Sequence, residues 1–555
     1  MACDHFCQLV TQVLGLLKMT RPWLLLFFLF HATPSSSGSK LRILLTAQNI
    51  AYSHVSFQKH LADILAQEGH YVRLAIHELR PISKVNAKYA QVTYVHSSVA
   101  KTEKNSQQDA IQAVFMNKTA YDDHGLKLFA NSAATMCKDV LSNNEYKNLL
   151  KEEHFDVAIG AEVDVCSLVL FKMLGIEAVI ITSPMPLHDQ QERIFGIPIQ
   201  RSYNTYIFNG DAAAPNLSFW KRLQAVYKEI KYALFNGDYV LETTQELLDK
   251  EYGKGKYNLR QMIREVDLVI TNGHELVDIA RLTTSKVVKI GGLAVAPPEK
   301  LSPKLESIML NAKHGVVLFS WGSQVDLSTL PRDLKLNLFN AFSKFPEIEF
   351  VLKYDRNQSD YFDIIDRYPN LHPFKWLHQT SILAHPKTKA FITHGGRNSL
   401  IEAVKFAVPT ISCPLFADQQ YNSAVFQHRG IGMTLEITSL SQENLIRALK
   451  QVLYNPRIRK NSHVLKAKLD AFPDSPRQKF INWVEYVAKF KSFPEFDLPG
   501  ATMNTVILHN LDVYVFLLAA STLLILIAIF VTHHVTSFVI PVIQTSIPAQ
   551  KLKVT

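Results

Sequence analysis

A short segment in the second half of the chain places a histidine and two glycines between a predicted strand and a predicted helix. It reads FITHGGRNS, begins at Phe391 and includes His394, Asn398 and Ser399. Glycine lets the backbone approach a ligand closely, and the N–H groups that begin a helix point at whatever lies before it. The segment is therefore a candidate anion site with a phosphate as the natural occupant, although a Gly-Gly turn before a helix is by itself more often only a tight turn.

A histidine near the N-terminus is a candidate for acid–base chemistry. His54 follows a predicted strand, in the segment YSHV. An imidazole titrates near neutral pH, so its neutral form can accept the proton of an attacking hydroxyl. The chain contains 21 histidines. Since any one of them is more often structural than catalytic, the residue type alone does not identify a base.

The elements that would position these groups alternate between apolar strands and helices. In the first half, a strand at 41–47, a helix at 55–67 and a strand at 71–76 form a βαβ unit, and a second unit begins at 155–161. This alternation is typical of a parallel sheet covered by helices. Residues 39–289 are therefore predicted to form a doubly wound, Rossmann-like domain.

The second half repeats the pattern after a break. Residues 290–303 contain adjacent glycines and several prolines and are predicted to be a linker. Residues 304–500 are predicted to form a second doubly wound domain, in which the strand at 390–393 leads into the glycine turn. The predicted fold class is α/β with two tandem domains, which suits a nucleotide on one side of a crevice and a second substrate on the other.

Apolar segments at both ends predict a membrane protein. Residues 513–531 are uncharged, and a helix of this length covers about 29 Å, close to the hydrocarbon thickness of a bilayer. Residues 1–38 have the layout of a secretory signal, with Arg21 before a short apolar run. Met19 lies just before this unit, so translation could start at Met1 or at Met19.

This layout predicts a single-pass type I protein with lumenal domains and a cytosolic tail at 532–555. Lys551 and Lys553 resemble the dilysine signal that returns proteins to the endoplasmic reticulum, although two chance lysines on a solvated tail are the alternative. Three sequence triplets are glycosylation acceptors that a lumenal domain could use, at Asn117, Asn216 and Asn357.

Composition excludes some classes of protein. The net charge of +10 is spread thinly, without the basic stripe of a nucleic-acid-binding protein, and could favour a lipid surface. Hydrophobic residues make up 47% of the chain, enough for packed cores. Beyond the signal region lie Cys137, Cys166 and Cys413. This odd number implies no disulfide framework, although a bridge between Cys137 and Cys166 is permitted.

The glycine turn belongs to a longer spaced pattern, which resembles the signature of the UDP-glycosyltransferase superfamily, the group that contains the UDP-glucuronosyltransferases. The resemblance extends over most of the predicted lumenal chain and implies the GT-B architecture. The matching positions of the signature are Trp376, Gln379, His394, Gly396, Asn398, Ser399, Glu402, Asp418 and Gln419.

The resemblance implies a role for each of these donor-site residues. Trp376 would stack on uracil with Gln379 beside it, and Glu402 would bind the ribose hydroxyls. Asp418 and Gln419 would hydrogen-bond the sugar. The diphosphate would be contacted by His394, Gly396, Asn398 and Ser399, and by an upstream loop that contains Ser320, Gly322 and Ser323.

The resemblance also implies that His54 is the general base, and here the chain departs from the family. The family's partner aspartate aligns with Ala161, whereas Glu162 and Asp164 lie one and three residues later. Glu162 is the favoured replacement, although a shift of one residue reverses the facing of a side chain in a strand. A second departure is His378, where proline is usual.

Two functions follow as alternatives. The first is an enzyme that transfers glucuronic acid or glucose from a UDP-sugar to a small lipophilic acceptor, with inversion, as in detoxification. The second is a non-catalytic UDP-sugar-binding scaffold in the same membrane. Neither a metal nor a cofactor is expected, because helix dipoles and His394 can stabilise the leaving charge. A homo- or hetero-oligomer is compatible with both alternatives.

Overall fold

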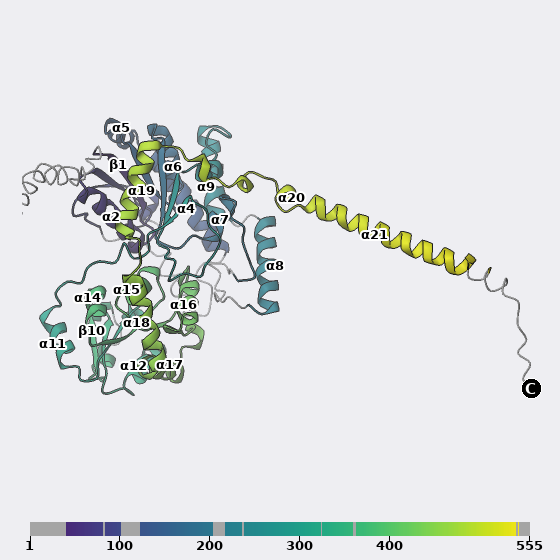
Figure 1. The fold of residues 1–555 in the computed structure, drawn as a ribbon. Coiled ribbons are helices and arrows are strands. Elements are labelled where there is room, and N and C mark those ends of the chain that lie inside the picture. The colour runs from purple at the N-terminus through teal and green to yellow at the C-terminus, as the bar shows by residue number, and fades with distance from the viewer. Residues whose placement is uncertain are drawn as a thin grey trace, which may run out of the picture.

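The computed structural model describes residues 40–80, 84–101, 123–203, 217–235, 238–323, 325–358, 362–539 and 542. Two α/β domains lie against each other, and one long helix extends from the side of the first (Figure 1). Several sequence-based predictions concern residues outside the described part of the chain and stay predictions: the signal region 1–38, Asn117, Asn216, Lys551 and Lys553.

The first domain contains a seven-stranded parallel sheet. The strand order reverses between β1 and β4, which pair directly with Ile43 beside Val157. Ligands of doubly wound sheets bind at such a reversal, beyond the carboxyl ends of the strands. In spatial order the strands are β3 (Gln91–Val95), β2 (Tyr71–His77), β1 (Arg42–Gln48), β4 (Val157–Ala161), β5 (Ala178–Ser183), β6 (Leu268–Thr271) and β7 (Val287–Lys289).

Helices cover both faces of this sheet. The first of them starts three residues earlier than predicted, so His54 lies in its first turn rather than before it. A disulfide joins Cys137 to Cys166 across two of these helices, while Cys413 is buried in the second domain. The α-helices are α2 (Tyr52–Gln67), α4 (Asp123–Ser142), α5 (Asn144–Glu152), α6 (Cys166–Leu174), α7 (Asp189–Ile194), α8 (Phe219–Phe235), α9 (Tyr239–Tyr252) and α10 (Leu259–Arg264).

The second domain contains a six-stranded parallel sheet in the order β10-β9-β8-β11-β12-β13. Its strands are β8 (Val316–Ser320), β9 (Glu349–Lys353), β10 (Leu371–Phe374), β11 (Thr388–Thr393), β12 (Thr410–Ser412) and β13 (Gly432–Thr434). Its helices are α11 (Pro303–Asn311), α12 (Arg332–Phe342), α13 (Phe362–Ile365), α14 (Gln379–Ala384), α15 (Arg397–Lys405), α16 (Gln419–His428), α17 (Gln442–Tyr454) and α18 (Pro456–Asp470).

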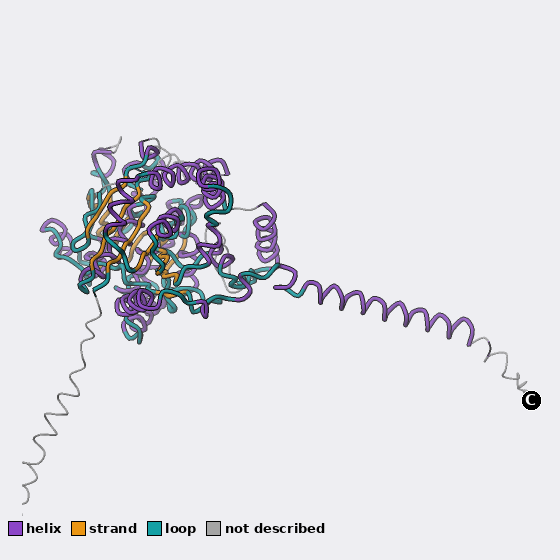
Figure 2. The backbone as a smooth tube through the Cα atoms, turned by 90° about the horizontal axis from the view of Figure 1, so that it is seen from above, coloured by secondary structure: helices purple, strands orange, loops and turns teal. Residues whose placement is uncertain are grey.

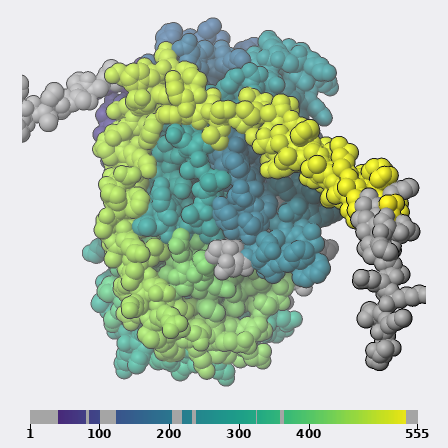
Figure 3. Space-filling model, turned by 45° about the vertical axis from the view of Figure 1, so that its right-hand side comes forward, coloured from purple at the N-terminus to yellow at the C-terminus, as the bar shows by residue number. Residues whose placement is uncertain are grey.

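The chain then returns to the first domain through α19 (Pro476–Phe490). Phe480 and Val484 are fully buried and pack in the same core cluster as Ile43 and Ile159 of the first sheet. Figure 3 shows this C-terminal segment running back over the first domain before it leaves the body. The sequence pattern shows that this helix is amphipathic, but not which domain its apolar face covers.

Beyond α20 (Thr505–Leu508), the helix α21 (Leu511–His534) stands clear of both domains (Figure 2). Within the helical span Leu511–Ser537, the most apolar 18-residue window has a mean hydropathy of 2.8, and none of that window is buried. The helical span is long and apolar enough to cross a bilayer, and it contains the predicted span 513–531. The helix is therefore a candidate transmembrane anchor at the C-terminal end.

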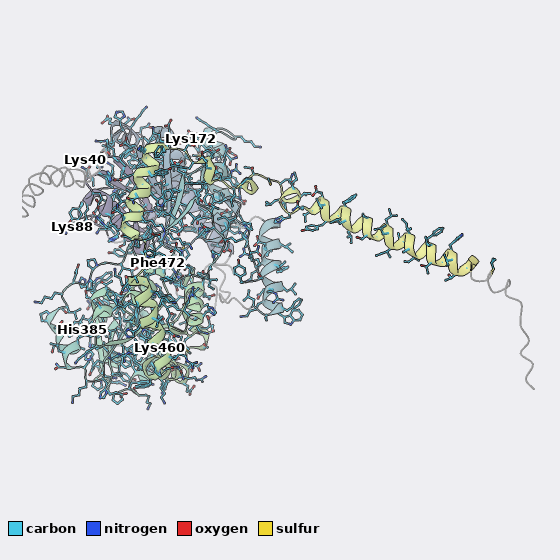
Figure 4. All side chains as sticks on the ribbon, viewed as in Figure 1. Lys40, Lys88, Lys172, His385, Lys460 and Phe472 are labelled. Carbon is cyan, nitrogen blue, oxygen red and sulfur yellow. A yellow bond between two sulfur atoms is a disulfide. The ribbon has the colours of Figure 1, made fainter. Side chains whose placement is uncertain are left out.

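A buried ion pair joins the two domains. Arg397, the first residue of α15, donates from Nη1 and Nη2 to the two carboxylate oxygens of Asp278 at 2.7 and 2.9 Å. Its Nε donates to the carbonyl oxygen of Asn272 at 2.9 Å. The ring of Phe472, labelled near the domain junction in Figure 4, packs against His274 with 4.8 Å between centroids. Arg397 is thus part of the domain interface, a role that its sequence position did not suggest.

We expect Asp278→Ala to lower the free energy of unfolding by about 3–5 kcal/mol, because it leaves a buried guanidinium without its carboxylate. The double variant Asp278→Leu/Arg397→Met removes both charges and should cost much less than the sum of the single variants. Chemical denaturation of the detergent-solubilised protein measures these differences. The exposed pair of Arg477 and Glu68 is the control, and R477A should cost no more than about 1 kcal/mol. If the cost of the double variant equalled the sum of the costs of the two single variants, Asp278 and Arg397 would not form a coupled pair.

Candidate active site

The predicted site residues lie where the carboxyl ends of the two sheets face each other. From the first domain come His54 and Glu162, which follow β1 and β4. From the second come the loops after β8, β11 and β12. Two contacts show that these edges meet: Asn272 Nδ2 donates to Asn398 Oδ1 at 2.7 Å, and the Tyr52 ring meets the Trp376 ring edge-on with 6.2 Å between centroids.

The glycine turn after β11 forms a close fit around the ring of His394. Gly322 has φ +78°, and a Cβ placed there would lie 2.8 Å from His394 Cε1. A Cβ at Gly396 would also clash with this ring. Both glycines are therefore required by close approach, and the loop after β8 is held against the start of α15.

The charge environment keeps His394 neutral. Burial, together with the nearby positive charge of Lys353, lowers the pKa of His394 to about 4. Lys353 Nζ donates to the carbonyl oxygens of Gly322 at 2.7 Å and Ser323 at 3.3 Å, so it fixes the same loop. Sequence reasoning missed Lys353, since a lysine that ends a buried strand has no distinctive local pattern.

The predicted uridine end contains the exposed ring of Trp376 and the carboxyl group of Glu402. Trp376 is 54% exposed, which leaves its face accessible for stacking. Gln379 Nε2 donates to Glu402 Oε2 at 2.6 Å and to Ser399 Oγ at 3.0 Å, so these three predicted residues form one network. Burial raises the pKa of Glu402 to about 7, although the Gln379 hydrogen bond opposes the shift. His378 points to solvent and pairs with the exposed Glu299 at 3.4 Å.

At the predicted sugar end, the pKa of the buried Asp418 depends in part on a charge in the first domain. Burial raises the pKa of Asp418 to about 6, against a hydrogen bond from Asn422 Nδ2 at 2.7 Å. The negative charge of Glu162 adds to this rise, so the two carboxyl groups lie within electrostatic reach across the crevice. Gln419 Oε1 accepts from the backbone N–H of Leu415 at 2.9 Å. Its carbonyl oxygen is therefore already used in holding the loop.

His54 has the environment of a base. Its Nδ1 is buried and has no hydrogen-bond partner among the described residues. Burial lowers the pKa of His54, and the charge of Glu162 opposes that shift. Glu162 Oε2 accepts from Gln191 Nε2 at 2.9 Å and lies 3.3 Å from His188 Nε2. Sequence reasoning did not identify Gln191 or His188 as supports of this carboxylate.

Asp164 has a different position. Its Oδ2 lies 2.6 Å from His77 Nδ1 and accepts from Ser167 Oγ at 2.6 Å, within the buried core of the first domain. His77 Nε2 in turn lies 3.2 Å from Tyr146 Oη. Because Asp164 is committed to this network, the geometry favours Glu162 as the partner of His54.

A cavity of about 700 Å³ adjoins Glu162 in the first domain. It is large enough for a small organic molecule. Apolar side chains share its wall with buried polar groups, and burial raises the pKa of one of these, Asp238, to about 6. Residues of its lining include Leu168, Met185, His188, Ile194 and Tyr239. The position beside Glu162 makes it a candidate acceptor site.

Comparisons with known proteins find relatives over most of the chain. The sequence profile of the family described as UDP-glucuronosyl and UDP-glucosyl transferase matches residues 42–544. The chain is 28% identical over 494 residues to ugt-48 of Caenorhabditis elegans, covering 85% of this chain and 91% of that protein. It is 25% identical over 493 residues to human UDP-glucuronosyltransferase 2B7, covering 87% of this chain and 91% of that protein.

Solved structures show the same fold at lower identity. The glycosyltransferase of kitacinnamycin matches with a TM-score of 0.55 at 16% identity, over 81% of this chain and 98% of that one. The spinosyn forosaminyltransferase SpnP matches with a TM-score of 0.54 at 15% identity, over 81% of this chain and all of that one. Both support the two-domain GT-B architecture. The chain belongs to the UDP-glucuronosyl and UDP-glucosyl transferase family and is a glycosyltransferase.

Proposed function

We propose that the chain transfers glucuronic acid or glucose from a UDP-sugar to a hydroxyl of a small lipophilic acceptor, as in detoxification. One observation carries this proposal: the contacts of Tyr52 with Trp376 and of Asn272 with Asn398 bring the segment that contains His54 against the expected donor-site residues. The anomeric carbon of a bound sugar would then lie near His54 and the acceptor cavity. The alternative of a non-catalytic scaffold gives no reason for this convergence.

In the proposed reaction, His54 takes the proton of the acceptor hydroxyl while its oxygen bonds to the anomeric carbon. The bond from that carbon to the UDP oxygen breaks on the opposite face, so the configuration inverts. The lowered pKa of His54 keeps the ring neutral and able to accept a proton. Glu162 then stabilises the imidazolium that forms.

The leaving diphosphate would lie at the N-terminus of α15. The backbone N–H groups of Asn398 and Ser399 and the positive end of the helix dipole favour its charge. Neutral His394 can donate one hydrogen bond to a phosphate oxygen. These groups would stabilise the departing charge without a metal ion, and no cofactor enters the proposed reaction.

We further propose that the enzyme is a type I protein of the endoplasmic reticulum with lumenal domains. The disulfide between Cys137 and Cys166 supports an oxidising compartment. Asn357 is exposed, as a glycosylated asparagine must be. The candidate anchor α21 fits a membrane location, while the retrieval role of Lys551 and Lys553 stays a prediction.

We expect membranes that contain the chain to release UDP from UDP-glucuronic acid or UDP-glucose when phenolic or steroidal acceptors are added. His54→Ala should lower turnover by about 10²–10⁴-fold, the usual contribution of a general base. Binding of the UDP-sugar should remain, because His54 lies on the acceptor side. Retained UDP release in this variant would contradict the assigned base. Donor binding without turnover by the wild type on any acceptor would favour the scaffold.

We expect Glu162→Gln and Asp164→Asn to differ in their pH profiles. Glu162 raises the pKa of His54, so its neutralisation should move the acid limb of kcat/KM to lower pH. The rate at the optimum should fall by at most about tenfold for each unit by which the pKa of His54 is lowered, because the proton is only partly transferred in the transition state. Asp164→Asn should leave the acid limb in place, even if it destabilises the His77 network. Retained UDP-sugar binding shows that each variant is folded. If only Asp164→Asn shifted the acid limb of the pH profile, Asp164 and not Glu162 would be the partner of His54.

A further inference from the structure

The helix α8 carries an apolar face that no described part of the protein covers. Six of its apolar side chains repeat at intervals of three and four residues, which places them on one side of the helix. All of them are strongly exposed: Phe219 60%, Trp220 73%, Leu223 49%, Val226 45%, Tyr227 66% and Ile230 52%. We call these six residues the α8 stripe.

The stripe points away from the body of the protein. Ala225, on the opposite side of the helix, is 2% exposed. Glu229 also faces inward, where its carboxylate accepts from Arg193 Nε at 3.0 Å and from Arg201 Nε at 2.8 Å. These contacts fix the rotation of α8 about its axis. The apolar stripe is therefore presented outward by the fold itself.

Basic residues flank the stripe. Arg222 and Lys231 lie at its two edges by helical spacing, and both are exposed. Lys221 is also exposed, while the acidic residue of α8, Glu229, is paired with the body. An apolar face with aromatic rings and basic edges is typical of a helix that lies in the headgroup region of an anionic membrane.

The position of α8 is also the one expected of a helix that lies on the membrane surface. Figures 1 and 2 both show α8 on the side of the body from which α20 and α21 leave, and Figure 1 shows it lying crosswise to α21. A helix crosswise to a membrane-spanning helix lies along the membrane plane. Next to it, α20 exposes Val506 (48%) and Ile507 (55%). The apolar surfaces of α8 and α20 therefore continue toward the anchor.

We propose that the α8 stripe inserts into the headgroup region of the membrane that α21 spans. Two anchors then hold the first domain against the lipid, one spanning the bilayer and one lying on it. Lys228 and Lys231 of α8 also line the cavity beside Glu162. If that cavity holds the acceptor, as the proposed function states, the acceptor site lies beside the helix that contacts the lipid.

Spin labels on the full-length chain test this insertion independently of activity. Val226→Cys places a label within the stripe, and Lys460→Cys places one on the exposed surface of the second domain labelled in Figure 4. The chain without an introduced cysteine provides the labelling background. Each protein is reconstituted into vesicles of phosphatidylcholine with a minor fraction of phosphatidylserine.

Oxygen concentrates in lipid, whereas a polar nickel chelate stays in water. We expect the label at position 226 to be relaxed more by oxygen than by the chelate, with the reverse at position 460. Equal behaviour at the two positions would overturn the proposal, because the stripe would then be solvated. Protection from both reagents, with dipolar broadening between labels, would also overturn it and show that a second copy covers the stripe.

Tryptophan emission gives a second readout without a label. Lipids brominated along the acyl chain should quench Trp220 in the wild type, so W220F should lose a quenched component. W376F is the matched control, since Trp376 is also exposed but lies in the candidate active site. Quenching that is unchanged in W220F would count against insertion. If the wild type shows the quenched Trp220 component but releases no UDP with any acceptor, the proposed function is contradicted and the membrane contact still holds.

Discussion

The buried pair between Arg397 and Asp278 is the interaction on which the site depends. Arg397 begins α15, and the next two residues supply the N–H groups expected to hold the diphosphate. A guanidinium that is 4% exposed needs a bidentate partner, and Asp278 of the first domain provides it. The same pair therefore sets the start of α15 against the first domain. The neighbouring hydrogen bond from Asn272 to Asn398 fixes the register of this contact.

Burial of this crevice determines its electrostatics. The pKa values of Glu402 and Asp418 are raised and that of His394 is lowered, chiefly by burial in each case. All three shifts favour the neutral form. A sugar or ribose hydroxyl that donates to either carboxylate would stabilise the ionised form, so binding and ionisation are coupled. Charge developing on a leaving phosphate is also stabilised more strongly in such a site than in water.

Much of the architecture could be predicted from sequence, because its signals are local. Apolar runs alternate with helices in both halves, and the structure has two parallel sheets as expected. The return of α19 to the first domain could not be predicted, since its apolar face would suit either core. The Lys353 contacts and the support of Glu162 by Gln191 also join segments far apart in the chain. No spacing within one segment encodes such contacts.

Glu162, the expected replacement for the family aspartate, lies just beyond the strand that Ala161 ends. Ala161 ends β4 and is 5% exposed, so a side chain there is constrained by the pleat and by the core. Glu162 lies in the turn beyond the strand, where the alternation of facing no longer applies. Its longer side chain is held by Gln191 and His188 instead of by the strand. The orientation of the charge beside His54 therefore depends on α7 and the residue before it, which also line the candidate acceptor cavity. If His54 is the base and this cavity holds the acceptor, as proposed, the same side chains set the shape of the acceptor site and the strength of the base.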